Sequence, residues 1–254
     1  MSARAYRTFQ ALILAILGIF LLFKIYDGKV LLYINQRFVL LVMLGALGCM
    51  LLSQAMLRGR SEGSGYEHFD FTSEPHLTAG EQERFSGWTL WWLALPLLMG
   101  LLVPQRPLGA SALANRAVYT TAPLTARSAD GALALELPAE ERNALDWIRA
   151  FHFATDPAIF VGQPANVTGF VYHDPRLEAG QFLLGRFTLT CCVADAMAIG
   201  MVIEWQEAES LPDNAWVRVQ GEIALQQVEG QSQPKILAKA VQVVPEPLQP
   251  YFFP

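Results

Sequence analysis

Charged residues are scarce in this chain of 254 residues, and the motifs of catalysis and of nucleic-acid binding are missing. Only 16% of the residues are charged, whereas ordinary soluble domains have about 25%. The net charge is −5, and no basic stripe is interleaved with aromatic residues, which argues against nucleic acid as a partner. Neither a Ser/His/Asp pattern nor a phosphate-binding glycine loop is present, and a cysteine nucleophile would need a base beside it. We therefore expect no enzymatic activity.

Hydrophobic residues, in contrast, make up 53% of the chain and are concentrated in three uncharged runs. The runs cover residues 9–23, 38–52 and 88–103. Each reaches the length of a membrane span, about 17 to 25 residues, when its flanks are included. Three buried core helices are the alternative, but the chain has too little polar sequence to surround them. We predict transmembrane helices at 8–27, 36–56 and 87–104, with the lipid bilayer as their surroundings.

The orientation of these spans follows from the basic residues beside them. The first run is expected to remain as an anchor, because no small-x-small cleavage site follows it. Basic residues are balanced between the two sides, but Arg58 and Arg60 directly follow the second span. The positive-inside rule then assigns the loop after this span to the cytoplasm and all residues after Val103 to the outside. The predicted location is the inner membrane, with several spans and an extracytoplasmic C-terminal domain.

Two polar segments separate the spans from this C-terminal domain. The first is a loop at 58–86, whose His68 and His76 are isolated and are interpreted as solvated. The second is a linker at 105–135, which is punctuated by proline and glycine and then rich in threonine, alanine and serine. These segments divide the chain into spans at 1–57 and 87–104 and a soluble domain at 136–254.

The soluble domain begins with a helical pattern and continues with strands. Apolar residues at 145, 148 and 151 share one face of a helix that starts after Pro138. Five stretches then alternate in strand fashion, with turn residues between them, at 165–172, 182–191, 198–205, 216–225 and 235–244. They predict a small antiparallel β-barrel of the OB type. Its predicted core consists of Val167, Phe170, Phe187, Leu189, Val202, Val217 and Val219.

Two of the three cysteines stand side by side in the stretch TLTCCVADA, as Cys191 and Cys192, with Asp195 three residues later. Three interpretations stay open. Thiols are often buried, so the pair can simply pack in the core. A disulfide between neighbours is strained and easily reduced, which would suit a redox switch. Thiolates also bind soft metal ions, and Asp195 would be the third ligand or would organise the loop.

A metal site at this stretch requires more than the stretch itself. Zinc takes four ligands in structural sites, so a fourth residue must come from elsewhere in the fold. The candidates are His152, His173 and Asp174. This interpretation predicts zinc or another soft metal ion as the cofactor. The third cysteine, Cys49, lies inside the second apolar run and is interpreted as a small membrane-facing residue.

Several motifs along the chain resemble a known family. They are YINQRF at 33–38, PLLMGLLVP at 96–104, RPLG at 106–109, ANR at 114–116 and RFTLTCCVADA at 186–196. Together they resemble the YcgQ-like family of bacterial membrane proteins over nearly the whole chain. The cysteine block is the most specific of these motifs. Where the family often has His-Pro, this chain has Asn35 and Gln36, so no role of that histidine carries over.

The resemblance implies an accessory subunit of a two-component membrane permease, which pairs with a larger polytopic permease subunit. The permeases in question belong to a family that includes metalloid exporters. We expect the extracytoplasmic domain to capture a soft metal or metalloid at Cys191, Cys192 and Asp195. The spans are expected to bind the permease through Gly45, Gly48, Pro96 and Gly100. A purely structural partner with packed cysteines, or a redox-sensing module with a vicinal disulfide, is the alternative.

Overall fold

The computed structural model describes residues 3–58, 87–116, 118–119, 136–228 and 231–253. The chain forms two compact units. The helical unit comprises Met1–Leu31 and Arg37–Gln105, and the sheet unit comprises Leu32–Gln36 and Arg106–Pro254. The short segment Leu32–Gln36 thus belongs to the sheet unit although helices precede and follow it in the sequence.

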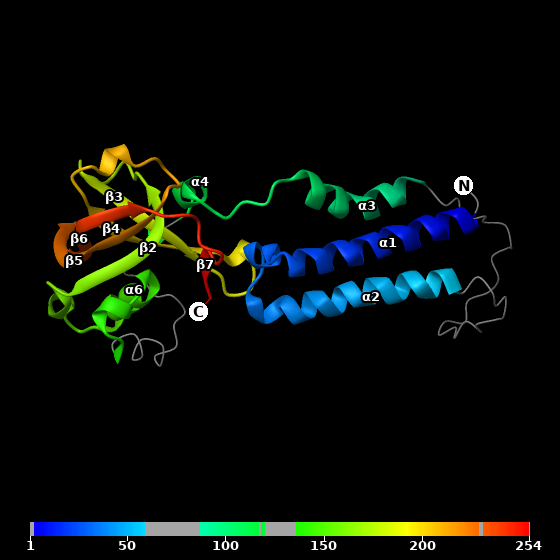
Figure 1. Ribbon diagram of the computed structural model, residues 1–254, viewed down its shortest axis with the longest axis horizontal. Coiled ribbons are helices and arrows are strands. Elements are labelled where there is room, and N and C mark those ends of the chain that lie inside the picture. The colour runs from blue at the N-terminus through cyan, green and yellow to red at the C-terminus, as the bar shows by residue number, and fades with distance from the viewer. Residues whose placement is uncertain (1–2, 59–86, 117, 120–135, 229–230, 254) are drawn as a thin grey trace, which may run out of the picture. The chain divides into compact units, whose positions relative to one another are not determined.

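The described residues of the helical unit form three apolar helices, α1 (Ala3–Tyr26), α2 (Val39–Arg58) and α3 (Gly87–Leu102) (Figure 1). Within the described ranges, two segments are long and apolar enough to cross a membrane, Ala5–Tyr26 and Gln36–Arg58. These correspond to the first two predicted spans. The third predicted span is a helix of 16 residues with Pro96 inside it, which is shorter than the usual span. His68 and His76 lie outside the described residues.

Small residues bring α1 and α2 together. Ala11 and Ala46 are fully buried, and the hydroxyl of Ser53 donates a hydrogen bond of 2.7 Å to the carbonyl of Ala11. A side chain at Gly18 would lie 2.9 Å from the carbonyl oxygen of Ala46. Close backbone approach through small residues, with a hydroxyl bonded across the helices, is the packing mode of helices in lipid.

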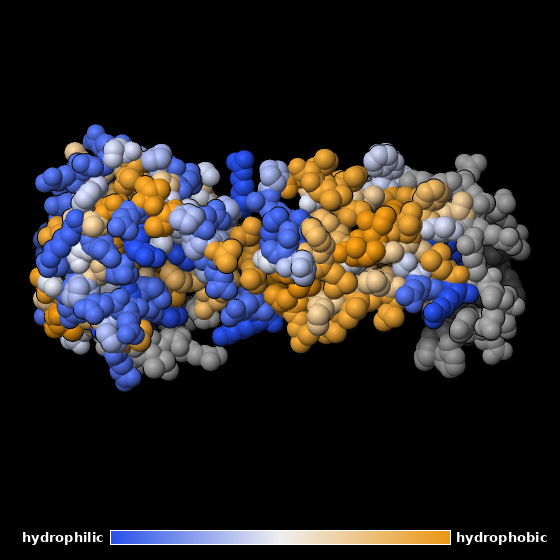
Figure 2. Space-filling view, viewed as in Figure 1, coloured by the Kyte–Doolittle hydropathy of each residue, from blue (hydrophilic) through white to orange (hydrophobic). Residues whose placement is uncertain are grey.

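The remaining surface of these helices is hydrophobic. Figure 2 shows hydrophobic side chains over the helices and mainly hydrophilic ones over the sheet unit. Only 11% of the most apolar window in α1 or α2 is buried, whereas the core helix of a soluble protein is mostly buried. Large exposed side chains include Phe9, Ile19, Phe23, Leu40, Leu41, Leu51, Trp88, Trp91 and Trp92. Such a surface is costly in water and suits lipid or a partner.

The sheet unit is built on a mixed sheet of seven strands among the described residues. They are β1 (Val118–Tyr119), β2 (Pro164–Tyr172), β3 (Gln181–Thr188), β4 (Met197–Glu204), β5 (Trp216–Val228), β6 (Gln231–Val243) and β7 (Tyr251–Phe252). The pairings β2–β3, β3–β4, β4–β6, β6–β5 and β5–β2 form a closed circuit. All are antiparallel except β4–β6. The short strands β1 and β7 pair in parallel with β4 and β3.

The five predicted strands correspond to β2 to β6, with differences at their ends. One of them concerns β3, which ends at Thr188, whereas the prediction extended it through Cys191. The two short strands β1 and β7 were not predicted. The segment predicted as a linker also carries structure, because helix α4 (Ala110–Ala114) and β1 lie within it. The sheet unit therefore begins well before residue 136.

The predicted core residues are all buried, on two sides of the sheet. On one side, α6 (Ala144–Phe153) covers the sheet with Trp147, Ile148 and Phe151. This helix starts later than predicted. Residues after Pro138 form a 3-10 turn, η3 (Ala139–Glu141), and the α-helix begins only after Asn143. The reason is a capping box, in which Asn143 and Asp146 bind each other's backbone amides.

Candidate functional site

The two adjacent cysteines lie in the turn between β3 and β4. We call residues 189–196 the cysteine loop; it includes the 3-10 turn η5 (Val193–Asp195). The side chain of Cys191 is exposed and that of Cys192 is half-buried, and all three cysteines of the chain are free. The two sulfur atoms of the pair are 3.5 Å apart. Packing in the core is therefore the wrong interpretation for Cys191, because its side chain is exposed.

Asp195 organises the backbone of this loop. Its carboxylate accepts hydrogen bonds from the amide of Cys191 at 2.7 Å and from the amides of Thr190 and Cys192 at 3.3 Å each. Burial alone would raise the pKa of Asp195, but hydrogen bonds from the Cys191 side chain and from these amides outweigh it and lower the pKa. Both carboxylate oxygens are thus occupied by the loop itself. Of its two predicted roles, the observed contacts match that of loop organiser.

The same carboxylate controls the ionisation of the exposed thiol. The hydrogen bond with Asp195, followed by the one with Cys192, raises the pKa of Cys191 to about 12. The thiol form is favoured because a thiolate would face a carboxylate and a second sulfur. Nucleophilic cysteines need the opposite, a lowered pKa. Any ion that binds Cys191 as a thiolate must therefore displace its proton.

A second residue, Asn35, holds the loop from the other side. It is 1% exposed, and its side-chain amide donates to the carbonyls of Leu189 at 3.2 Å and of Thr190 at 3.0 Å. Its backbone amide donates to the carbonyl of Cys191 at 2.9 Å. Sequence reasoning missed this role, although Asn35 lies in one of the motifs that carry the family resemblance.

The neighbours of Asn35 extend this contact into a short β-bridge. Ile34 pairs with Cys192 in antiparallel fashion, and the carbonyl of Tyr33 accepts a hydrogen bond of 2.8 Å from the amide of Val193. We call the segment of residues 33–35 the docking arm. It connects two apolar helices in the sequence and at the same time is an edge of the cysteine loop.

The C-terminal strand supports the start of the cysteine loop. The amide of Leu189 donates a hydrogen bond of 2.9 Å to the carbonyl of Phe252 in β7. The buried Arg186 lies beneath this strand, with its guanidinium 4.2 Å from the ring centre of Phe252 and bonded to the carbonyls of Thr168 and Gln249. Burial lowers the pKa of Arg186 to about 10. This cation therefore fastens the chain end to β2 and β3.

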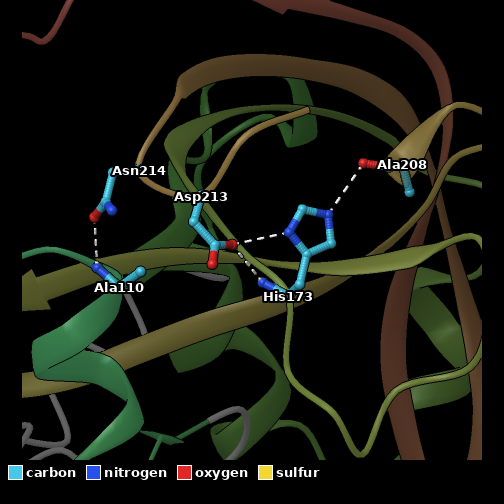
Figure 3. Close-up of polar contacts among 5 residues, drawn as sticks. All are labelled: Ala110, His173, Ala208, Asp213 and Asn214. Carbon is cyan, nitrogen blue, oxygen red and sulfur yellow. Dashed lines mark hydrogen bonds and ion pairs between the residues drawn. The ribbon is translucent and has the colours of Figure 1, made fainter. Parts of the chain in front are cut away.

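The candidate fourth ligand His173 is engaged elsewhere (Figure 3). Its Nδ1 is 2.8 Å from a carboxylate oxygen of Asp213, and its Nε2 is 3.1 Å from the carbonyl oxygen of Ala208. The neighbouring Asn214 accepts a hydrogen bond of 2.7 Å from the amide of Ala110, at the start of α4. His173 thus ties the loop after β2 to the connection between β4 and β5.

The strand register separates His173 from the cysteines. Tyr172, directly before it, pairs with Leu183 near the start of β3. The cysteines follow the other end of this strand at Thr188, five residues or about 17 Å further along. The adjacent Asp174 is paired with Arg176, and that partner lowers its pKa most strongly. The structure therefore does not bring His173 and Asp174 to the cysteine pair.

The last candidate ligand, His152, lies near the end of α6 with its ring 5.1 Å from that of Phe153. Among the described residues, no group of three or more His, Cys, Asp or Glu side chains is arranged to hold a metal ion. A preformed four-ligand zinc site is thus not present in this part of the chain. Cys191 and Cys192 are the only two cysteines that the described residues place together.

The glycines predicted to bind a partner differ in their surroundings. A side chain at Gly45 or Gly48 would meet no heavy atom within 4 Å. A side chain at Gly100 would lie 2.7 Å from the ring of Phe20, so this glycine packs against α1 within the chain. Pro96 lies inside α3. The predicted partner surface therefore remains open at Gly45 and Gly48.

Comparison with known proteins covers most of the chain. Residues 9–119 match the DUF1980 N-terminal domain, and residues 135–254 match the DUF1980 C-terminal domain. The UPF0703 protein YcgQ of Bacillus subtilis (strain 168) is 28% identical over 68 residues, which are 27% of this chain and 24% of that protein. The chain thus aligns with about a quarter of that relative's length. With both domains present in order, the chain belongs to the DUF1980 family of YcgQ-like proteins.

Proposed function

We propose that this protein is an accessory subunit of a membrane permease, whose extracytoplasmic domain captures a thiophilic ion at Cys191 and Cys192. The observation that carries the proposal is the exposed pair of sulfurs, 3.5 Å apart, on a loop whose backbone is bonded from both sides by Asn35 and Asp195. An ordinary surface turn has no need of so many fixed backbone contacts. The protein captures the ion and hands it over, and it catalyses no reaction.

The docking arm supports three membrane crossings. Because Ile34 pairs with Cys192, the connection between α1 and α2 lies on the same side of a membrane as the sheet unit. If α2 crosses, the chain must cross again before Arg106, and α3 is the apolar helix available in the described part of that interval. Its 16 residues span about 24 Å, and local thinning of the bilayer accommodates the missing few ångströms. Arg58 at the end of α2 supports a cytoplasmic position for that end.

The strand pairings support a small barrel of the OB type for the sheet unit. Five strands form a closed circuit, and the one parallel pair, β4–β6, closes it. A five-stranded, partly open Greek-key barrel has this plan. In such a barrel the ligand contacts come from the face of the second and third strands and from the loops after the first and fourth strands. The cysteine loop joins the second and third strands of the circuit, β3 and β4.

The geometry of the sulfurs suits one soft ion shared between them. Two thiolates at about 2.3 Å from a tetrahedral ion lie roughly 3.8 Å apart, close to the observed 3.5 Å. Soft ions prefer thiolates to carboxylates, and the oxygens of Asp195 are already bonded to amides. We therefore assign the ligand role to the two sulfurs and the organising role to Asp195. The remaining positions on the ion stay open, which suits transfer better than permanent storage.

Metal titration of the full-length protein in detergent, with reductant and without oxygen, tests the capture site. The parent is expected to bind one zinc ion per chain, and Cys191→Ser and Cys192→Ser are each expected to abolish binding. Cys49→Ser is the matched control, because this thiol lies in α2, and it should bind as the parent does. No bound zinc in the parent, or unchanged binding in both variants of the pair, contradicts the proposal. If the purified parent has two fewer titratable thiols than its three cysteines provide, this supports the redox alternative with a vicinal disulfide instead.

A further inference from the structure

The hydrogen bonds between the docking arm and the cysteine loop all go to the backbone of the loop. Its hydrogen bonds reach the carbonyls of Leu189, Thr190 and Cys191 and the amide of Val193. The backbone of Cys192 is extended, with φ −153° and ψ 172°, as its bridge to Ile34 requires. The arm therefore determines where both sulfurs lie without taking part in their chemistry.

The arm is also directly linked to the apolar helices. Asn35 is four residues before Val39, where α2 begins, so the chain between them spans at most about 14 Å. On its other side, Tyr33 follows a short 3-10 turn, η1 (Lys29–Leu32). If the arm moves, only the few residues between it and the ends of α1 and α2 can change conformation to allow the movement.

We propose that the docking arm is the sensing element of the cysteine pair, with Asn35 as its positioning residue. The docked arm holds both sulfurs at the separation that is needed to bind one ligand atom together. Binding of that atom by both sulfurs in turn stabilises the docked arm. This proposal rests on the capture function proposed above and adds the route by which capture reaches the helices. The coupling is reciprocal, because a ligand that prefers the docked state must also favour it.

Asn35 is suited to this role because it is buried and has both donors in use. Its two carbonyl partners lie directly before Cys191, and its backbone amide binds Cys191 itself. Loss of these donors removes a hydrogen bond from the carbonyl of the buried Leu189 and one from the carbonyl of Thr190, which favours undocking. A ligand that needs both sulfurs then loses its preformed geometry, whereas a reagent that modifies one thiol does not.

Phenylarsine oxide is the probe for shared binding. Two S–H groups and the arsenic–oxygen bond are replaced by two arsenic–sulfur bonds, one water molecule leaves, and arsenic stays trivalent, so no oxidant is needed. N-ethylmaleimide is the probe for a single thiol, to which it adds without a second partner. Both reagents are applied to three full-length proteins in detergent. These are the parent, Asn35→Asp and the uncharged variant Asn35→Ala.

Asn115→Asp is the matched control, because its side-chain amide also donates to a carbonyl, that of Ser111, but at an exposed site. We expect the Asn35 variants to bind phenylarsine oxide at least about ten-fold more weakly than the parent. Asn35→Ala should react with maleimide at Cys191 within about two-fold of the parent rate. Asn115→Asp should match the parent in both reactions.

Hydrogen exchange on the parent gives a second readout that needs no variant. Binding of phenylarsine oxide is expected to slow exchange of the amides of Asn35 and Val193, which form the arm's backbone bonds. Equal affinity in the Asn35 variants together with unchanged exchange overturns the sensing role and leaves the capture function in place. A parent that does not bind the probe at all overturns both proposals.

Discussion

Asn35 and Asp195 divide the backbone of the cysteine loop between them: Asn35 donates to its carbonyls, and Asp195 accepts from its amides. The two side chains are 160 positions apart in the sequence, yet both bind the backbone of Thr190. The loop residues that these two side chains bind all lie outside the strands of the sheet. The position of the two thiols therefore depends on a tertiary contact and not on β3.

Asp195→Asn should activate the exposed thiol. The carboxylate is the main cause of the raised pKa of Cys191, so its loss lowers that pKa toward the ordinary value. We expect alkylation of Cys191 by iodoacetamide at about pH 8 to become at least about ten-fold faster. Asp156→Asn is the control, because Asp156 also caps a 3-10 turn, η4 (Pro157–Phe160), but far from the cysteines in sequence. Equal rates in parent and Asp195→Asn would contradict this assignment.

His173 should make the sheet unit less stable as the pH rises. Burial alone would lower its pKa, but hydrogen bonds to Ala208 and Asp213, with the charges of Asp213 and Glu209, outweigh burial and raise it. Both ring nitrogens face acceptors, which only the doubly protonated ring satisfies. A raised folded-state pKa means that the stabilisation is complete below about pH 6.5. It is lost as the pH rises through the raised value.

Denaturant titrations of the parent and His173→Gln at several pH values measure this effect. The side chain is partly exposed, so solvent screening limits the difference to about 1 kcal/mol or less. Asp213→Asn should reduce the pH dependence as well. A difference between parent and His173→Gln that stays constant from about pH 5 to about pH 9 would rule the mechanism out.

The proposed topology predicts where fused reporters become active. Reporters joined after Gly63 should report the cytoplasm, and those joined after Ala126 should report the outside, because the chain crosses once between them. Activity of both fusions on the same side would show that α3 does not cross. The reverse pattern would keep three crossings but move the cysteine loop to the cytoplasm.

A large side chain should destabilise the helical unit at one glycine, Gly18, and leave its stability unchanged at another, Gly45. Gly18→Leu places a Cβ 2.8 Å from Met50 and 2.9 Å from the carbonyl of Ala46, and such overpacking costs about 1 to 3 kcal/mol. Gly45→Leu meets no heavy atom within 4 Å, so thermal melting in detergent should be unchanged. If Gly45 faces the permease, the same variant should reduce recovery of the complex. A lower melting temperature in Gly45→Leu alone would refute this distinction.

The regular elements of the sheet unit were predictable because their patterns are local. Alternation of apolar residues predicted β2 to β6 and the burial of Val167, Phe187 and Val219. The same rule failed for β1 and β7, since two-residue strands are too short to have a period. It also extended β3 through Cys191, because apolar residues continue after Thr188. The end of that strand is determined by the hydrogen bonds of Asp195 and of the docking arm.

By itself, the sequence determined which segments are apolar enough to leave water, which stretches alternate as strands, and which two residues carry adjacent thiols. Each of these properties depends on composition or on a period within one segment. Only the tertiary structure decided that Asn35, between two apolar helices, is part of the sheet unit, and that His173 and Asp174 lie away from the cysteines. The physical reason is that hydrogen bonds between distant backbone segments leave no periodic trace in the sequence, and strand register alone determines which ends of the strands meet.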